Sequence, residues 1–210
     1  LDGIVLPKKN KPEIAVMNKK QQLRLEKYLD ERPSVTSVGI AISMYMGLRI
    51  GEVCALQWKE IDLEKRVLTV SKTIQRVQCR TGSKQTKLII TEPKSESSKR
   101  TIPIPDCLLP LLRRFKDNGE VYVVSGRKKP VEPRTMQYRF AKILHNADLP
   151  SFHYHSLRHL FATRCVELGF DVKTLSEILG HSSVEVTLNR YIHSDMERKR
   201  TCMSLLSKCA

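Results

Sequence analysis

The hydrophobic pattern of the chain has a helical period at both ends and a period of two in the middle. Near the N-terminus, apolar side chains recur every three or four residues, which predicts amphipathic helices. Each of these helices is preceded by a residue type that caps helix N-termini. The defining positions are Leu23, Leu25, Tyr28 and Leu29 after a capping Asn18, and Val35, Val38, Ile42 and Met46 after a capping Ser34.

From Ile61 to Pro105 the alternation of apolar and polar residues predicts short strands joined by polar turns. The predicted strands are Val67–Val70, Thr73–Val77, Lys87–Ile90 and Thr101–Ile104, with turns at Thr81–Lys84 and Ser95–Ser98. Pro103 and Pro105 cannot donate a ladder hydrogen bond, so the last strand is expected at an edge. We expect one small antiparallel sheet.

The helical period returns after the strands. Asp106, Asp171 and Ser183 are candidate N-caps, and Gly169 and Gly180 are candidate helix ends. The predicted helices are 106–115, 134–147, 156–168, 172–179 and 184–191, with a final amphipathic helix in the tail 193–210. The chain is therefore expected to be an α+β domain that is mostly helical.

Charge narrows the class of partner. The formal net charge is +15 and the pI is about 9.7, which favours a polyanion such as nucleic acid. A merely solvated basic surface is the alternative. The chain contains no apolar run long enough to cross a bilayer and no secretory signal, so no membrane association is expected. Six cysteines without a C-x-x-C pair indicate a reducing, cytoplasmic setting.

The candidate chemistry lies in a few polar residues. Arg49 stands between Gly47 and Gly51, whereas His155, Arg158, His181 and Tyr191 occupy a short C-terminal segment. Two arginines can bind the oxygens of a phosphodiester, histidines can transfer protons, and a deprotonated tyrosine can attack phosphorus. This set suggests cleavage of a nucleic-acid backbone without metal.

Each of these residues also has a plainer interpretation. An arginine can be one of 37 basic residues on the surface, and Tyr191 can be a partly buried aromatic. Lys94, on the last predicted turn, is either a proton donor to the leaving hydroxyl or a solvated turn lysine. His159, with His153 or His155, could form a zinc pair, but no H-E-x-x-H sequence or carboxylate accompanies it. We interpret His159 as a packed helix residue.

The motifs around these residues resemble those of the tyrosine recombinase (phage integrase) family. The segment from Met46 to Trp58 resembles the first arginine box of the family, and Pro93–Pro103 resembles its lysine-bearing hairpin. The second box is similar to His155–Thr163, Ile178–His181 and Thr187–Tyr191, in the family's order. The resemblance implies a DNA breaking-rejoining catalytic domain that is mostly helical with a small antiparallel sheet.

The resemblance also implies a role for each matching residue. Arg49 and Arg158 would hold the scissile phosphate, His181 would bond one of its oxygens, and Glu52 would orient Arg49. Lys94 would protonate the leaving 5′-hydroxyl, and His155 would accept or transfer a proton. Tyr191 would form a covalent 3′-phosphotyrosyl link. No cofactor, metal or ATP would be needed, because the covalent link conserves the bond energy.

Family members act on double-stranded DNA at recombination sites and associate on it, so a tetrameric synapse is implied. We expect residues 1–14 to be a linker from a missing N-terminal core-binding domain, and 15–192 to be the catalytic domain. The tail 193–210 is expected to pack in trans on a neighbouring subunit. A type IB topoisomerase and a catalytically idle DNA-binding protein remain alternatives.

Overall fold

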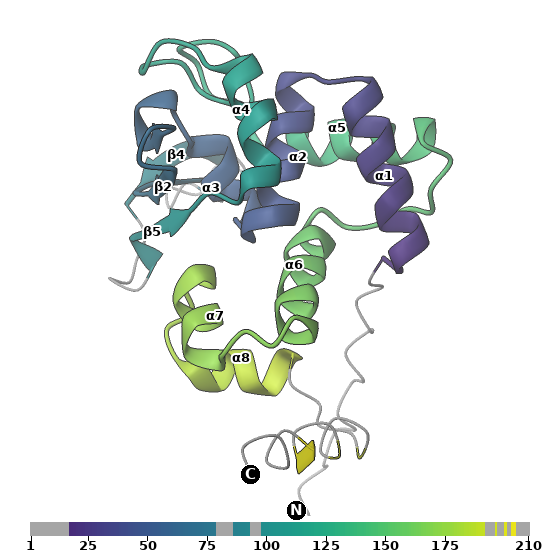
Figure 1. The fold of residues 1–210 in the computed structure, drawn as a ribbon. Coiled ribbons are helices and arrows are strands. Elements are labelled where there is room, and N and C mark those ends of the chain that lie inside the picture. The colour runs from purple at the N-terminus through teal and green to yellow at the C-terminus, as the bar shows by residue number, and fades with distance from the viewer. Residues whose placement is uncertain are drawn as a thin grey trace, which may run out of the picture.

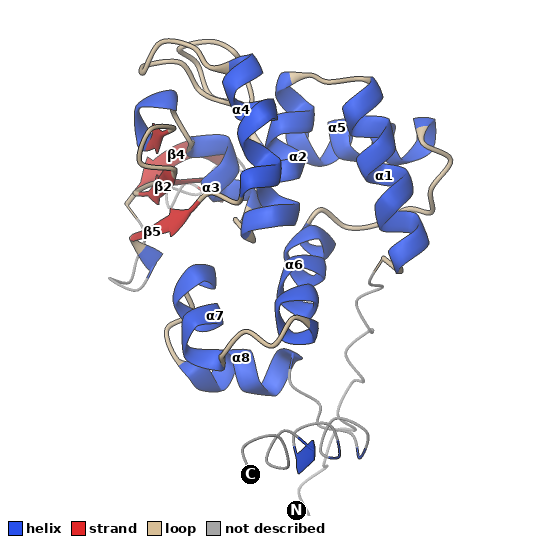
Figure 2. Cartoon of the chain, in the orientation of Figure 1, coloured by secondary structure: helices blue, strands red, loops and turns tan. Residues whose placement is uncertain are grey.

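The computed structural model describes residues 17–78, 86–92 and 98–191, except the side chains of 189–191, together with Met196, Arg200, Met203 and Ser204 in helical conformation. Its helices and strands follow the hydrophobic pattern closely (Figures 1 and 2). The helices are α1 (Lys19–Glu31), α2 (Val35–Met46), α3 (Ile50–Ala55), α4 (Leu109–Phe115), α5 (Pro133–Asn146), α6 (His155–Glu167), α7 (Val172–Leu179) and α8 (Val184–Tyr191). The strands are β1 (Ile61–Asp62), β2 (Val67–Val70), β3 (Thr73–Gln78), β4 (Thr86–Thr91) and β5 (Arg100–Pro103).

Both predicted N-terminal caps are present. The Asn18 side chain accepts from the backbone of Gln21 in a reciprocal capping box, and the Ser34 hydroxyl accepts from the backbone of Ser37. These bonds satisfy backbone donors that the first helical turn leaves without an intrahelical partner. The predicted starts of α1 and α2 are therefore confirmed.

The strands are antiparallel as predicted, but they form two sheets instead of one. In the first, β2 lies between β1 and β5, with Leu68 opposite Ile102. In the second, β3 pairs with β4, with Ile74 opposite Ile90. The chain leaves the first sheet after Val70. The alternation of apolar and polar residues continues into β3, but the hydrogen-bond ladder of the first sheet does not. Within the first sheet β5 is an edge strand, as its prolines predicted.

Helix α2 forms the centre of the hydrophobic core because nearly all of its residues are buried. It packs against α3, α4, α5 and α6, and Figure 1 shows these helices around it. The helix predicted to start at Asp106 begins differently. A short 3-10 turn, Asp106–Leu108, precedes α4, so Asp106 lies inside the turn and Pro105 takes the capping position.

The three C-terminal helices lie together beneath α2 and β5 (Figure 1). Asp171 caps α7 through the backbone of Thr174, as predicted. Gly180 ends α7 with φ +64°, and Gly169 follows α6 with φ +82°. Both are left-handed conformations that favour glycine, so α6, α7 and α8 are separated where the sequence indicated.

The predicted turns at 81–84 and 95–97 and most of the predicted tail helix 193–210 lie outside the described residues. Among the helices that the structure describes, none combines the length and apolar character that a bilayer span requires.

Candidate active site

The bend between α2 and α3 positions Arg49. Helix α2 ends at Gly47 with φ +70°, and Arg49 takes the N-cap position of α3 in an extended conformation. The Glu52 carboxylate then binds Arg49 twice, accepting from its backbone N–H at 2.8 Å and from its guanidinium at 2.9 Å. The side chain of Arg49 is consequently oriented, yet it remains 37% exposed. A ligand can therefore reach it.

Arg158 lies one turn into α6 and is buried, with 2% of its surface exposed. Its guanidinium donates to the carbonyl of Gly47 at 2.7 Å and to that of Leu179 at 2.8 Å. A Cβ at position 47 would lie 2.5 Å from a ring carbon of Phe161 on the same helix. Glycine at 47 thus permits both the left-handed bend and the close approach of α6.

The C-terminal end of α7 is where the two arginines meet. Arg49 donates to the carbonyl of Leu179 at 3.4 Å and to that of Gly180 at 3.0 Å, while Arg158 uses the same Leu179 oxygen. Carbonyls in the last turn of a helix have no intrahelical donor and attract cations. Side chains that are 109 residues apart in sequence are therefore brought to a single oxygen atom.

His181 follows directly after these carbonyls. Its Nδ1 lies 2.7 Å from the hydroxyl of Thr187, a buried residue of α8, and this contact fixes the plane of the imidazole. Position 191 ends α8 one helical turn after Thr187, so this helix connects His181 to the predicted nucleophile. The side chain of Tyr191 lies outside the described residues.

His155 is the first residue of α6 and is exposed. Its ring packs edge-on against His159, with ring centroids 4.6 Å apart. His159 is buried, which confirms its interpretation as a packed helix residue. Of the predicted site residues, the structure thus brings Arg49, Glu52, Arg158 and the backbone before His181 together. Lys94 falls in the segment 93–97, outside the described residues.

Sequence reasoning missed one residue of this cluster. Arg100, at the start of β5, places two guanidinium nitrogens 3.1 and 3.0 Å from the two oxygens of Glu52. It also donates to the carbonyl of Ile178 at 2.6 Å and to that of Ser98 at 3.0 Å. Both side chains of this ion pair are buried, with 7% of Arg100 and 3% of Glu52 exposed.

The strand alternation contained a signal for Arg100. Arg100 and Ile102 are two apart and so share a face of β5, and Ile102 is buried. A basic side chain on an inward-facing strand position needs a carboxylate partner.

The buried carboxylate is ionised. Burial alone would raise the pKa of Glu52, but the guanidinium of Arg100, reinforced by Arg49, holds the pKa below its ordinary value. Three guanidinium groups and one carboxylate therefore meet here, and two positive charges remain uncompensated among these four side chains. Such a cluster is suited to bind an anion with several oxygens, such as a phosphodiester.

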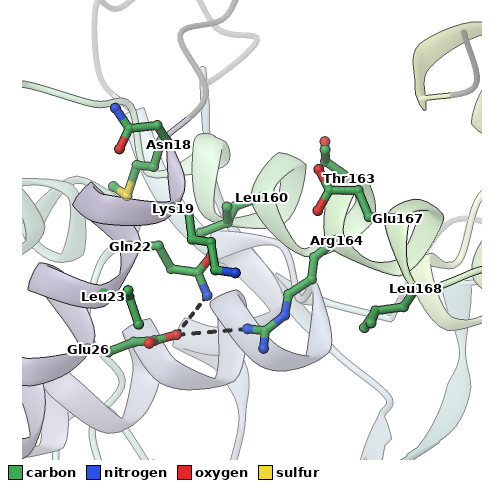
Figure 3. A pocket seen from close by; sticks show the side chains of 11 residues that line it. Asn18, Lys19, Gln22, Leu23, Glu26, Leu160, Thr163, Arg164, Glu167 and Leu168 are labelled. Carbon is green, nitrogen blue, oxygen red and sulfur yellow. Dashed lines mark hydrogen bonds and ion pairs between the residues drawn. The ribbon is translucent and has the colours of Figure 1, made fainter. Parts of the chain in front are cut away.

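A separate pocket of about 490 Å³ lies between the start of α1 and the second half of α6 (Figure 3). There Glu26 accepts from Gln22 at 2.7 Å and from the hydroxyl of Tyr45 at 2.8 Å, and pairs with Arg164 at 3.9 Å. Figure 3 shows Gln22 and Arg164 pointing toward Glu26. This pocket contains none of the predicted site residues. The arginine cluster lies elsewhere, near the ends of α2 and α7.

The two buried cysteines among the described residues, Cys54 and Cys165, do not support nucleophilic chemistry. Burial raises the pKa of the Cys54 and Cys165 thiols to about 12, which keeps both protonated at neutral pH. In the described part of the chain, no three His, Cys, Asp or Glu side chains gather in a way that could hold a metal ion.

Comparison with solved structures identifies the fold. The integrase of the Tn1549 transposon, solved in complex with transposon right-end DNA, superimposes with a TM-score of 0.75 at 26% identity. The match covers 97% of this chain and 69% of that chain. The XerA recombinase shares the fold with a TM-score of 0.67 at 20% identity, over 95% of this chain and 66% of that chain.

Proteins that are similar in sequence are recombinases as well. A XerC-like tyrosine recombinase of Caldanaerobacter subterraneus is 33% identical over 77% of this chain and 46% of its own length. The tyrosine recombinase XerA of Pyrococcus furiosus is 34% identical over 67% of this chain and 44% of its own length. The chain thus spans about half the length of the curated relatives it matches. Because the sequence model of the phage integrase family matches residues 15–198, the chain belongs to that family.

Proposed function

We propose that this chain is the catalytic domain of a site-specific recombinase that cuts and rejoins DNA strands through a covalent 3′-phosphotyrosyl intermediate. One observation carries the proposal: Arg49 and Arg158 converge on the carbonyl of Leu179, two residues before His181. This is the geometry expected if two arginines and a histidine bind one phosphate. The net charge of +15 supports a DNA partner.

In the cleavage step, the phenolic oxygen of Tyr191 attacks phosphorus in line with the leaving 5′-oxygen. The phenol proton passes to His155, the P–O5′ bond breaks, and Lys94 protonates the departing oxygen. Charge on the non-bridging oxygens is stabilised by Arg49 and Arg158, which are oriented before DNA binds and need little reorganisation. His181 bonds one of these oxygens, and Glu52 keeps Arg49 in place.

Rejoining reverses these steps with a different 5′-hydroxyl. The hydroxyl of another strand attacks the phosphotyrosine, Tyr191 leaves, and it recovers its proton. One phosphoester replaces another at each step, so neither ATP nor a metal ion is required. The arginines, histidines and lysine of the proposed set provide the charge stabilisation and proton transfer.

The proposal is tested with the full-length protein and a nicked recombination-site oligonucleotide, from which the cleaved fragment diffuses away. A covalent adduct is expected on a denaturing gel with the wild type and should be absent with Tyr191→Phe. Tyr138→Phe is a matched control, because Tyr138 is exposed on α5, and its adduct should persist. An adduct with Tyr191→Phe would show that another residue is the nucleophile.

The role of Lys94 requires a substrate with a sulfur leaving atom at the 5′ position. A thiolate leaves without a proton, so Lys94→Ala should slow cleavage of normal DNA far more than cleavage of the sulfur substrate. If Lys94→Ala slows cleavage of both substrates equally, Lys94 does not protonate the leaving oxygen.

The alternatives predict different products. A type IB topoisomerase would relax plasmids without giving recombinants, and an idle DNA-binding protein would bind salt-sensitively without any adduct. A recombination assay with two marked sites identifies the recombinase, and plasmid relaxation together with the adduct gel separates the other two functions.

The assembly follows from the same proposal. We expect the full-length protein to bind double-stranded DNA in the bacterial cytoplasm and to form a tetrameric synapse on paired sites. The tail 193–210 is expected to pack on a neighbouring subunit, and residues 1–14 to lead from a core-binding domain. Sizing of the complex on DNA, with and without the tail, tests the synapse.

A further inference from the structure

Arg100 joins three parts of the candidate site that are distant in sequence. From β5 it reaches Glu52 on α3 with two hydrogen bonds and the Ile178 carbonyl on α7 with one. It also holds the Ser98 carbonyl, which directly follows the segment that contains Lys94. The same guanidinium therefore contacts α3, which directly follows Arg49, and the end of α7, which lies just before His181.

Three consecutive carbonyls at the end of α7 accept from the arginines of this cluster. Ile178 accepts from Arg100, Leu179 from Arg49 and Arg158, and Gly180 from Arg49. The last turn of α7 is thus held by guanidinium groups from three other elements. A shift of Arg100 would move the acceptors that orient the other two arginines.

Gly180 gives independent evidence for this close packing. A Cβ at that position would lie 2.9 Å from a guanidinium nitrogen of Arg100 and 3.1 Å from its Cδ and Cζ atoms. The glycine before His181 thus meets two requirements, a left-handed φ and space for Arg100.

The charges define what Arg100 does. Glu52 binds both Arg49 and Arg100, and without Arg100 its negative charge would be balanced by Arg49 alone. A guanidinium neutralised in this way attracts a phosphate weakly. With Arg100 present, the carboxylate can orient Arg49 while the positive charge of Arg49 stays available.

We infer that Arg100 is a positioning residue for strand cleavage: it neutralises Glu52, so that Arg49 is oriented and still cationic toward the scissile phosphate. This inference rests on the proposed function. Arg100 acts through Glu52 and the end of α7, because its guanidinium nitrogens already donate to the Glu52 carboxylate and to the carbonyls of Ile178 and Ser98.

The test compares the full-length wild type with Arg100→Gln, Arg100→Lys and the double variant Arg100→Gln with Glu52→Gln. Arg100→Gln should lower the rate of adduct formation by about 10- to 100-fold, as expected for a displaced catalytic group. DNA affinity should change by less than about threefold, because many other cations contact phosphates. Arg100→Lys should recover part of the rate, since lysine restores the charge but not the bidentate geometry.

The double variant separates positioning from direct contact. If Arg100 acts by neutralising Glu52, removing the carboxylate as well should make the double variant faster than Arg100→Gln. If the double variant is no faster, Arg100 acts by another route and the inference is wrong. Arg66→Gln is the matched control, because Arg66 pairs with an exposed carboxylate, and its rate should equal that of the wild type.

A second measurement does not depend on activity. The pKa of Glu52, followed by carboxyl ¹³C NMR, should rise when Arg100 is replaced by glutamine, and an unchanged value would overturn the inference. If the wild type gives no adduct, the proposed function fails, whereas this titration still decides the relation between Arg100 and Glu52. Thermal unfolding shows whether Arg100→Gln is folded. If it is not, the rate of adduct formation and the pKa of Glu52 are measured with Arg100→Lys instead.

Discussion

Two ion pairs of this protein have the same length and different surroundings. Arg100 and Glu52 are 3.0 Å apart with 7% and 3% of their side chains exposed, and Lys59 and Glu120 are also 3.0 Å apart with 45% and 60% exposed. In both pairs the cation holds the pKa of the carboxyl below its ordinary value, although burial opposes the effect at Glu52. Only at Glu52 would loss of the partner leave a charge in a low-dielectric interior. Distance alone therefore does not identify the ion pair that matters for structure and function.

The largest effect is expected from Glu52→Gln, because it leaves the buried guanidinium of Arg100 without a counter-charge. Breaking a buried pair typically costs about 3–5 kcal/mol. The free energy of unfolding, measured with urea, should fall by an amount in this range. A change below about 1 kcal/mol would mean that the cluster relaxes into water and that the two ion pairs are equivalent.

A smaller effect is expected from Gly180→Ala, which tests how closely Arg100 packs against α7. Alanine at φ +64° should cost about 1–2 kcal/mol through backbone strain alone, and its Cβ would also displace Arg100. Gly169→Ala is the matched control, because φ there is +82° and no atom lies within 4 Å of the added Cβ. Gly180→Ala should therefore be the more destabilising substitution in urea unfolding, and equal losses would show that Arg100 moves aside freely.

The pH dependence of stability sharpens the comparison further. The folded-state pKa of Glu52 is below its ordinary 4.5, so its ionised form contributes stability above that value. This contribution is lost as pH falls through the folded-state pKa. The difference in unfolding free energy between wild type and Glu52→Gln should thus be constant at neutral pH and shrink below pH 4.5. If this difference in unfolding free energy does not change with pH, ionisation of Glu52 is not its cause.

The smallest effect is expected from Glu120→Gln, the same substitution in the exposed pair. Water and salt screen this pair, and long side chains lose entropy when they hold one geometry. Neither the melting temperature nor the rate of adduct formation should change measurably. If Glu120→Gln lost as much stability or activity as Glu52→Gln, the exposed pair would matter as much as the buried pair and the comparison would be wrong.

The sequence was sufficient for most of the secondary structure because its local signals agree. Asn18, Ser34 and Asp171 cap the helices that they were predicted to cap, and Gly180 ends α7 in the left-handed conformation that favours glycine. The strands were found by alternation, but their division into two sheets was not. Alternation reports which face of a strand is buried, whereas the choice of partner depends on contacts between distant segments.

For the site, the sequence by itself determined the residue types and their order: arginines, histidines and a tyrosine on a basic chain, in motifs that belong to the phage integrase family. Only the tertiary structure decided that Arg49, Arg100 and Arg158 converge on the last carbonyls of α7, and that Glu52 serves two of them. The physical reason is that an arginine's role depends on its burial and on the acceptors around it. Apart from the carboxylate of Glu52, those acceptors are backbone oxygens, which every residue has and which a sequence pattern therefore does not reveal.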